Sequence, residues 1–195
     1  MFYYFVKYLL TPFLYIFFFP KIIGKENTKI KGKAIVICNH SSMGDPLLIS
    51  AAFHRQILWM GKAELFEHKL LAAFFNGVRT FPVNRGESDL PAIRHTFKML
   101  RNGEILGIFS EGTRVKSEGI RDFEAGTSFI ALKSKAPIIP VYIGGNYKLF
   151  HRMTMIIGEP ILLSDHVGKI AGSKAAEEAT QLLQNKLKSM SEMQL

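Results

Sequence analysis

The feature that most constrains the fold is a short apolar run followed at once by a polar segment. Residues 34–38 read Ala-Ile-Val-Ile-Cys, and residues 39–46 read Asn-His-Ser-Ser-Met-Gly-Asp-Pro. A continuous run of five apolar residues bounded by polar ones predicts a buried strand. An imidazole, that of His40, therefore emerges at the end of a buried strand, with the carboxylate of Asp45 five residues later.

His40 and Asp45 can meet only if the chain turns between them. On one ideal helix, five residues correspond to about 500° of rotation, so the two side chains would point apart. Gly44 permits unusual backbone angles, and Pro46 suits the first position of a helix with Asp45 as its N-cap. A histidine oriented by an aspartate is the usual general base for an alcohol nucleophile. The alternative is that Asp45 only caps a helix and His40 only ends a strand.

The segment 40–45 resembles the H-x4-D motif of glycerolipid acyltransferases, and more specifically of the 1-acylglycerol-3-phosphate (lysophosphatidate) acyltransferase family. Three blocks similar to those of this family follow in the same order, at residues 77–85, 109–114 and 136–143. They read Gly-Val-Arg-Thr-Phe-Pro-Val-Asn-Arg, Phe-Ser-Glu-Gly-Thr-Arg and Ala-Pro-Ile-Ile-Pro-Val-Tyr-Ile. The resemblance implies that His40 is the catalytic base and that Asp45 fixes its tautomer.

The same resemblance implies a set of substrate-binding residues. The third block follows a predicted strand, and an arginine in such a loop can bind a phosphate through two parallel hydrogen bonds. The alternative for Arg114 is a surface ion pair with Glu111 or Glu118. The predicted substrate-binding residues are Arg85, Glu111, Gly112, Thr113, Arg114 and Lys62.

Composition favours anionic lipids as partners. Lys and Arg total 25 against 16 Asp and Glu, and 48% of the residues are hydrophobic. A basic, apolar chain suits an anionic membrane and anionic substrates. The sequence contains no recognisable nucleic-acid-binding module and no ligand spacing typical of a metal site. The one cysteine, Cys38, excludes an internal disulfide and is predicted to pack in the core.

The N-terminal segment is predicted to attach the protein to a membrane. Residues 2–19 are almost wholly apolar, and a stretch containing five lysines follows Pro20. The run is near the minimum length for a membrane span, and its aromatic residues also suit a helix lying in the interface. The lysines favour the cytoplasmic face of the cell membrane for the rest of the chain. A buried N-terminal helix is the alternative.

The remainder of the chain is predicted to be one α/β domain. Strands are predicted at residues 34–38, 56–60, 80–83, 105–109, 138–143 and 153–157. Helices are predicted at 46–53, 64–75, 89–102, 123–133 and from 173 to about 190. This alternation predicts a layered domain, with a mixed central sheet flanked by helices. The expected division is an anchor at 1–24 and an acyltransferase domain at 25–195.

The predicted activity is acyl transfer from acyl carrier protein or coenzyme A to the sn-2 hydroxyl of 1-acyl-glycerol-3-phosphate, which forms phosphatidate. The acyl thioester is a substrate, and no further cofactor is expected. The chain has no G-x-S-x-G nucleophile elbow, in agreement with direct attack by the acceptor hydroxyl. The alternatives are an acyltransferase for another lysophospholipid or for glycerol phosphate, and a non-catalytic lipid-binding membrane protein.

Overall fold

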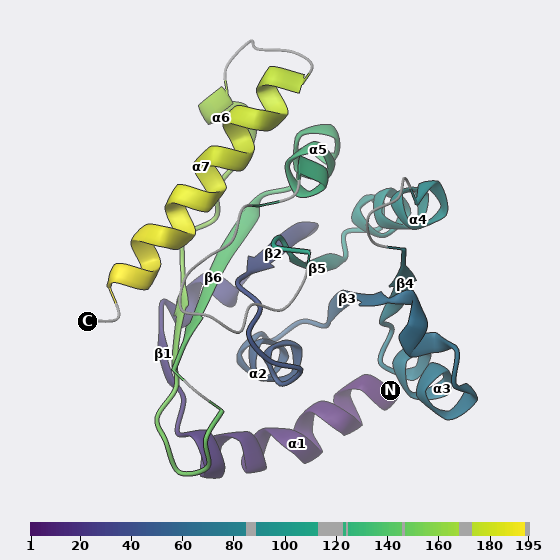
Figure 1. Ribbon diagram of the computed structural model, residues 1–195, viewed down its shortest axis with the longest axis vertical. Helices are drawn as coiled ribbons and strands as arrows, with labels where there is room; N and C mark the ends of the chain where they lie inside the picture. The colour runs from purple at the N-terminus through teal and green to yellow at the C-terminus, as the bar shows by residue number, and fades with distance from the viewer. Residues whose placement is uncertain (85–88, 113–122, 124, 146, 168–172, 194–195) are drawn as a thin grey trace.

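A mixed sheet forms the centre of the molecule (Figure 1). The computed structural model describes residues 1–84, 89–112, 123, 125–145, 147–167 and 173–193. Within these residues seven strands pair in the order β1-β7-β6-β2-β5-β3-β4, and every named pair is parallel except β6 with β7. The strands are β1 (Lys21–Ile23), β2 (Ala34–Cys38), β3 (Ile57–Lys62), β4 (Phe81–Val83), β5 (Ile105–Phe109), β6 (Ile138–Gly144) and β7 (Thr154–Ile157).

The apolar run that leads to His40 is the middle strand of this sheet. β2 lies between β5 and β6, with Cys38 opposite Phe109 on one side and Val141 on the other. All five residues of β2 are completely buried. A strand that is covered on both faces needs apolar residues on both, and this explains why the run does not alternate. The prediction of a buried strand is confirmed.

Helices cover both faces of the sheet, as Figure 1 shows. Residues of α4, α5 and α7 pack on one face, in a cluster that contains Ile35 and Ile37. Residues of α2, joined by Leu14 and Phe18 of α1, pack on the other face against Val36 and Cys38. The predicted α/β domain with a mixed sheet flanked by helices is therefore confirmed. The helices are α1 (Phe2–Phe18), α2 (Asp45–Ala52), α3 (Lys69–Gly77), α4 (Leu90–Arg101), α5 (Ala125–Ser134), α6 (Leu163–Val167) and α7 (Ser173–Glu192), with short 3-10 turns η1 (Lys25–Thr28) and η2 (Ala63–Phe66).

The first strand of the sheet was not among the strands predicted from the sequence. β1 pairs with β7 at the edge of the sheet, with Lys21 opposite Thr154 and Ile23 opposite Ile156. Three residues are too few for an alternating pattern to stand out, so this strand depends on its partner. The segment 1–24 therefore contributes a strand to the sheet as well as helix α1.

Helix α1 forms where the membrane anchor was predicted and packs beside α2. Two residues of α1, Tyr3 and Val6, are buried, and Lys7 donates a hydrogen bond from Nζ to the carbonyl of Phe53, just past the end of α2. Burial lowers the pKa of Lys7. No helix in the described part of the chain is long and apolar enough to cross a membrane. Membrane attachment stays a prediction.

Candidate active site

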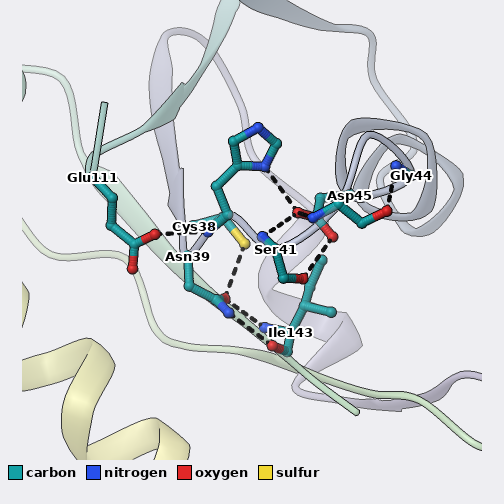
Figure 2. A network of polar contacts seen from close by, with 9 residues as sticks. Cys38, Asn39, Ser41, Gly44, Asp45, Glu111 and Ile143 are labelled. Atoms are coloured by element: carbon teal, nitrogen blue, oxygen red, sulfur yellow. Dashed lines mark hydrogen bonds and ion pairs between the residues drawn. The ribbon is translucent and has the colours of Figure 1, made fainter. Parts of the chain in front are cut away.

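The carboxylate of Asp45 folds the segment between β2 and α2 back on itself (Figure 2). Its Oδ2 atom accepts the backbone N–H groups of Ser41 and Ser42, each at 2.8 Å. α2 begins at Asp45, and Gly44 at the N-cap position makes no side-chain capping bond. The sequence suggested Asp45 as the N-cap of this helix, but Asp45 is instead its first residue and does not cap it. Its carboxylate binds the backbone of the preceding Ser41 and Ser42. These bonds close the turn that lets His40 and Asp45 meet.

His40 and Asp45 are in direct contact. Nδ1 of His40 lies 2.9 Å from Oδ2 of Asp45, and the two residues are 8% and 0% exposed. An ionised carboxylate can only accept, so Nδ1 carries a proton, and in the neutral imidazole Nε2 is then the unprotonated nitrogen. Nε2 is then able to take a proton from a bound hydroxyl group. The structure brings the predicted pair together in the geometry of a general base with its orienting carboxylate.

Two aromatic rings form a stack on one face of the His40 imidazole. The Phe109 ring stacks on His40 with 3.9 Å between ring centroids and 19° between planes. Trp59 stacks in turn on Phe109 at 4.8 Å, and its indole N–H donates to Ser50 Oγ at 3.1 Å. Packing on one face and a hydrogen bond at one edge leave His40 little freedom to rotate. Such restraint is what a base needs to remain aimed at its substrate.

The backbone around His40 is held by residues that follow two neighbouring strands. Oε2 of Glu111, just beyond β5, accepts the His40 backbone N–H at 3.1 Å, and Glu111 is 5% exposed. The side chain of Asn39 bridges to β6, where it accepts from the Ile143 N–H and donates to the Ile143 carbonyl, both at 2.8 Å. The sequence predicted Glu111 to bind substrate or to pair with Arg114, and it predicted no role for Asn39. A role that depends on contacts between strands leaves no local pattern.

Tyr147 is a further residue that sequence analysis missed. Its ring lies so close to Gly44 that a Cβ at that position would be 2.7 Å from a ring carbon. Burial raises the pKa of Tyr147, and the nearby negative charge of Asp45 raises it further. The ring also makes an edge contact with Phe18 of α1, at 5.3 Å between centroids. Tyr147 therefore connects the end of α1 to the turn that carries His40 and Asp45.

The predicted substrate-binding residues are placed only in part. Glu111 contacts the His40 backbone, and Gly112, the next residue, has a left-handed backbone with φ of 66°. Lys62, at the end of β3, is half exposed and forms an ion pair with Glu64 at 2.5 Å. Arg85, Thr113 and Arg114 lie outside the described residues. Within the described ranges, no three His, Cys, Asp or Glu side chains come together as metal ligands would.

An apolar cavity of about 430 Å³ lies beside His40. α1 contributes one wall, and α2, β3 and α3 contribute the others. Lys62 and Lys7 are the cationic residues among those that line it. Most of the lining is aliphatic or aromatic, and it includes Val6, Leu10, Leu14, Leu47, Phe74 and Phe75. The shape and chemistry suit a hydrocarbon chain whose reacting end lies at the imidazole.

Comparison with known proteins identifies the family. The family model described as Acyltransferase matches residues 20–144. The 1-acyl-sn-glycerol-3-phosphate acyltransferase of Bacillus subtilis is 33% identical over 179 residues, which cover 86% of this chain and 89% of the relative. The enzyme of the same name from Streptococcus pneumoniae is 28% identical, over 67% of this chain and 51% of the relative. That of Borreliella burgdorferi is 29% identical, over 66% of this chain and 52% of the relative. This chain therefore spans about half the length of the last two relatives.

A solved structure shares the fold. The crystal structure of the 1-acyl-sn-glycerophosphate (LPA) acyltransferase PlsC from Thermotoga maritima superposes with a TM-score of 0.71, over 97% of this chain and 81% of that chain. The two sequences are 19% identical, so this match concerns the fold alone. The extent of the family match and the Bacillus relative carry the assignment. The chain therefore belongs to the acyltransferase family, and the three relatives compared above bear the name 1-acyl-sn-glycerol-3-phosphate acyltransferase.

Proposed function

We propose that this protein transfers a fatty acyl group from a thioester to the sn-2 hydroxyl of 1-acyl-glycerol-3-phosphate and so forms phosphatidate. The observation that carries the proposal is the 2.9 Å contact between His40 and Asp45 beside an apolar cavity. The names of the relatives agree with this reaction. The donor is acyl carrier protein or coenzyme A carrying the acyl chain.

The reaction needs one base and no covalent enzyme intermediate. Nε2 of His40 takes the proton of the acceptor hydroxyl while the hydroxyl oxygen attacks the thioester carbonyl carbon. The Asp45 carboxylate stabilises the imidazolium that results. The tetrahedral intermediate then collapses, the carbon–sulfur bond breaks, and the leaving thiolate takes the proton back from Nε2. The products are phosphatidate and the free thiol, and the histidine is neutral again.

The cavity beside His40 is proposed to hold an acyl chain. Each methylene group removed from water contributes about 0.8 kcal/mol, so a chain within the cavity binds tightly without any polar contact. Binding of this kind holds the reacting carbon near the imidazole, which is where the barrier is lowered. Because α1 forms one wall of the cavity, the segment 1–24 is part of the proposed site as well as of the proposed membrane contact.

The phosphate of the acceptor is proposed to bind Arg85 and Arg114, with Lys62 nearby. The parallel strands β2, β3, β4 and β5 end at one edge of the sheet, where His40 lies. Arg85 follows β4 by two residues, and Arg114 follows β5 by five. Residues that follow parallel strands gather at the same edge, and ligands of open α/β sheets bind there.

Attachment to the membrane is proposed to occur through the outer face of α1, with the domain on the cytoplasmic side. One stripe of α1 packs on the domain, whereas Phe5, Leu9, Phe13 and Ile16 are exposed. A helix with one side packed on protein and the other apolar fits the plane of the interface. The lysines after Pro20 add attraction to anionic lipids.

A turnover assay with purified protein tests the proposal. Both donors are offered with a panel of acceptors, namely 1-acyl-glycerol-3-phosphate, other lysophospholipids and glycerol 3-phosphate. We expect phosphatidate from 1-acyl-glycerol-3-phosphate, and none with His40→Ala. Preference for another acceptor would assign a different acyltransferase reaction. Lipid binding without turnover on any acceptor would favour the non-catalytic alternative.

A further inference from the structure

Helix α3 is apolar, yet none of its residues is buried. It reads Lys-Leu-Leu-Ala-Ala-Phe-Phe-Asn-Gly, and Leu70, Leu71 and Phe74 are 75%, 46% and 39% exposed. A helix on the surface of a soluble domain normally turns its apolar residues inward. A contiguous exposed apolar patch marks a surface that binds something. We therefore expect the exposed face of α3 to be covered by a binding partner.

The exposed face of α3 continues into that of α1. The Phe74 and Phe2 rings are in edge contact at 6.2 Å between centroids. Gly77, at the end of α3, accommodates the Phe2 ring, because a Cβ there would lie 2.7 Å from a ring carbon. In Figure 1 α1 runs along the lower edge of the view, with α3 beside its N-terminal end. The two helices therefore form one surface.

The loop between β6 and β7 extends this surface at the other end of α1. Leu149 and Phe150 are 57% and 66% exposed. The Phe150 backbone N–H donates to the Phe17 carbonyl at 2.7 Å, and the two rings are 5.8 Å apart. We call the whole surface the apolar rim. Its members are Phe5, Leu9, Phe13 and Ile16 of α1, Leu70 and Leu71 of α3, and Leu149 and Phe150 of the loop.

Exposed cations border the apolar rim. Lys69 begins α3, Lys148 and Arg152 flank the loop tip, and Lys21 follows α1. Apolar and aromatic residues bordered by cations match the surface of an anionic bilayer, whose acyl boundary lies beneath charged headgroups. The cavity also has walls from both α1 and α3, so a bilayer on the rim would lie against the proposed acyl site.

We infer that the membrane-binding surface is the whole apolar rim, so that α3 and the Leu149–Phe150 tip contact an anionic phospholipid bilayer together with α1. This inference rests on the proposed attachment through α1 and extends it to two elements outside the N-terminal segment. The partner is the bilayer surface, and a second copy of the chain is the alternative that the experiment below distinguishes.

The chain offers a matched set of leucines for the test. Leu9, Leu70 and Leu149 are 51%, 75% and 57% exposed and lie on the three elements of the rim. Leu90, at the start of α4, is 56% exposed, and α4 packs on the opposite face of the sheet from α1. The one native cysteine, Cys38, is fully buried. A cysteine introduced at each leucine is therefore labelled selectively.

The experiment attaches an environment-sensitive fluorophore to Leu9→Cys, Leu70→Cys, Leu149→Cys and Leu90→Cys in the full chain. Vesicles of phosphatidylglycerol and phosphatidylethanolamine are then added. We expect a blue shift, and quenching by a lipid-borne quencher, at positions 9, 70 and 149 but not at 90. A response at 9 alone would overturn the inference and leave attachment through α1 intact. An equal response at 90 would also overturn it, because the contact would not be confined to the rim.

Two further measurements separate the other outcomes. A blue shift at position 70 that depends on protein concentration without vesicles would assign the rim to a second copy of the chain and overturn the inference. Leu70→Gln combined with Leu71→Gln should weaken vesicle binding by about tenfold or more, whereas Leu90→Gln should not. Neither leucine of α3 lines the cavity, so turnover on detergent-solubilised substrate should be unchanged. Vesicle binding without turnover by the wild type would reject the proposed reaction and leave the rim inference standing.

Discussion

The carboxylate of Glu111 accepts the backbone N–H of His40 at 3.1 Å, although 71 positions separate the two residues in sequence. The contact is possible because β2 and β5 are parallel neighbours and Cys38 pairs with Phe109. Glu111 contacts the backbone N–H of His40, whereas Asp45 contacts Nδ1 of its ring. One holds its backbone and the other holds its ring, so the imidazole is fixed at two points.

Replacement of Glu111 by Ala should lower kcat about tenfold and leave the KM for the acceptor nearly unchanged. A buried N–H that loses its partner costs about 1–3 kcal/mol, and here the loss would destabilise the conformation that holds His40 in place. Glu111→Gln should keep most of the activity, because its amide oxygen still accepts. Steady-state kinetics on both variants checks this. A rise in acceptor KM at constant kcat would instead support the substrate-binding role predicted from the sequence.

Replacement of His40 by Ala should lower kcat at least 10²–10⁴-fold, about the range for loss of a general base. Single-turnover rates with a saturating acyl donor provide the measurement, and circular dichroism shows whether the variant is folded. Near-wild-type turnover by a folded variant would mean that another group takes the proton.

Asp45→Asn should lower turnover with little change in acceptor KM. The Asn amide group can donate to Nδ1 of His40, which favours the tautomer with the proton on Nε2, and that tautomer cannot accept from the hydroxyl. If Asp45 were only a helix cap, Asn would replace it without loss. Comparison of kcat and KM for the variant and the wild type decides between the two roles.

Gly44→Ala should reduce the free energy of unfolding by about 1–3 kcal/mol, as overpacking does. The new Cβ would lie 2.7 Å from the Tyr147 ring, and the φ of −76° at Gly44 is ordinary for any residue. Urea unfolding provides the measurement. Gly126→Ala in α5 is the control, because nothing lies within 4 Å of its Cβ position. Removal of the ring with Tyr147→Leu should recover part of the loss, and equal losses in both backgrounds would contradict the clash.

Cys38 should not react with a thiol reagent at pH 8 until the protein unfolds. Burial raises the pKa of the Cys38 thiol well above its ordinary value, and the charges of Asp45 and Glu111 add to the effect. A raised folded-state pKa contributes stability below about pH 8.5, the unfolded value, and this contribution is lost as the pH rises towards the folded value. Reagent uptake against urea concentration checks the first statement. Cys38→Ala should remove this alkaline loss of stability.

Arg114→Ala should lower the kinetic efficiency for 1-acyl-glycerol-3-phosphate by about one to two powers of ten. A charge-assisted hydrogen bond to phosphate contributes roughly 1.5–3 kcal/mol. Monoacylglycerol lacks the phosphate, so it should be a poor acceptor for the wild type. The kinetic efficiency for monoacylglycerol should change little with the substitution. A two-by-two assay of both proteins on both acceptors gives the answer. An equal loss of kinetic efficiency on the two acceptors would show that Arg114 does not bind the phosphate.

The sequence alone predicts those parts of the structure that depend on contiguous residues. The run Ala34–Cys38 is continuous and apolar because β2 is covered on both faces, so its burial is readable without a structure. The pair His40 and Asp45 is likewise local, since the Asp45 carboxylate closes the turn with Ser41 and Ser42. The order and spacing of the motifs therefore predicted both the family and the contact between His40 and Asp45.

Tertiary structure decided the contacts whose partners are distant in sequence. Glu111 meets His40 only because β5 lies beside β2, and Tyr147 meets Gly44 only because the loop after β6 folds over the turn. β1 is three residues long and exists as a strand through β7. Hydropathy along the chain reports which residues avoid water, but not which of them meet. Strand order therefore decides which side chains hold His40 in place, and a single local segment cannot encode that order.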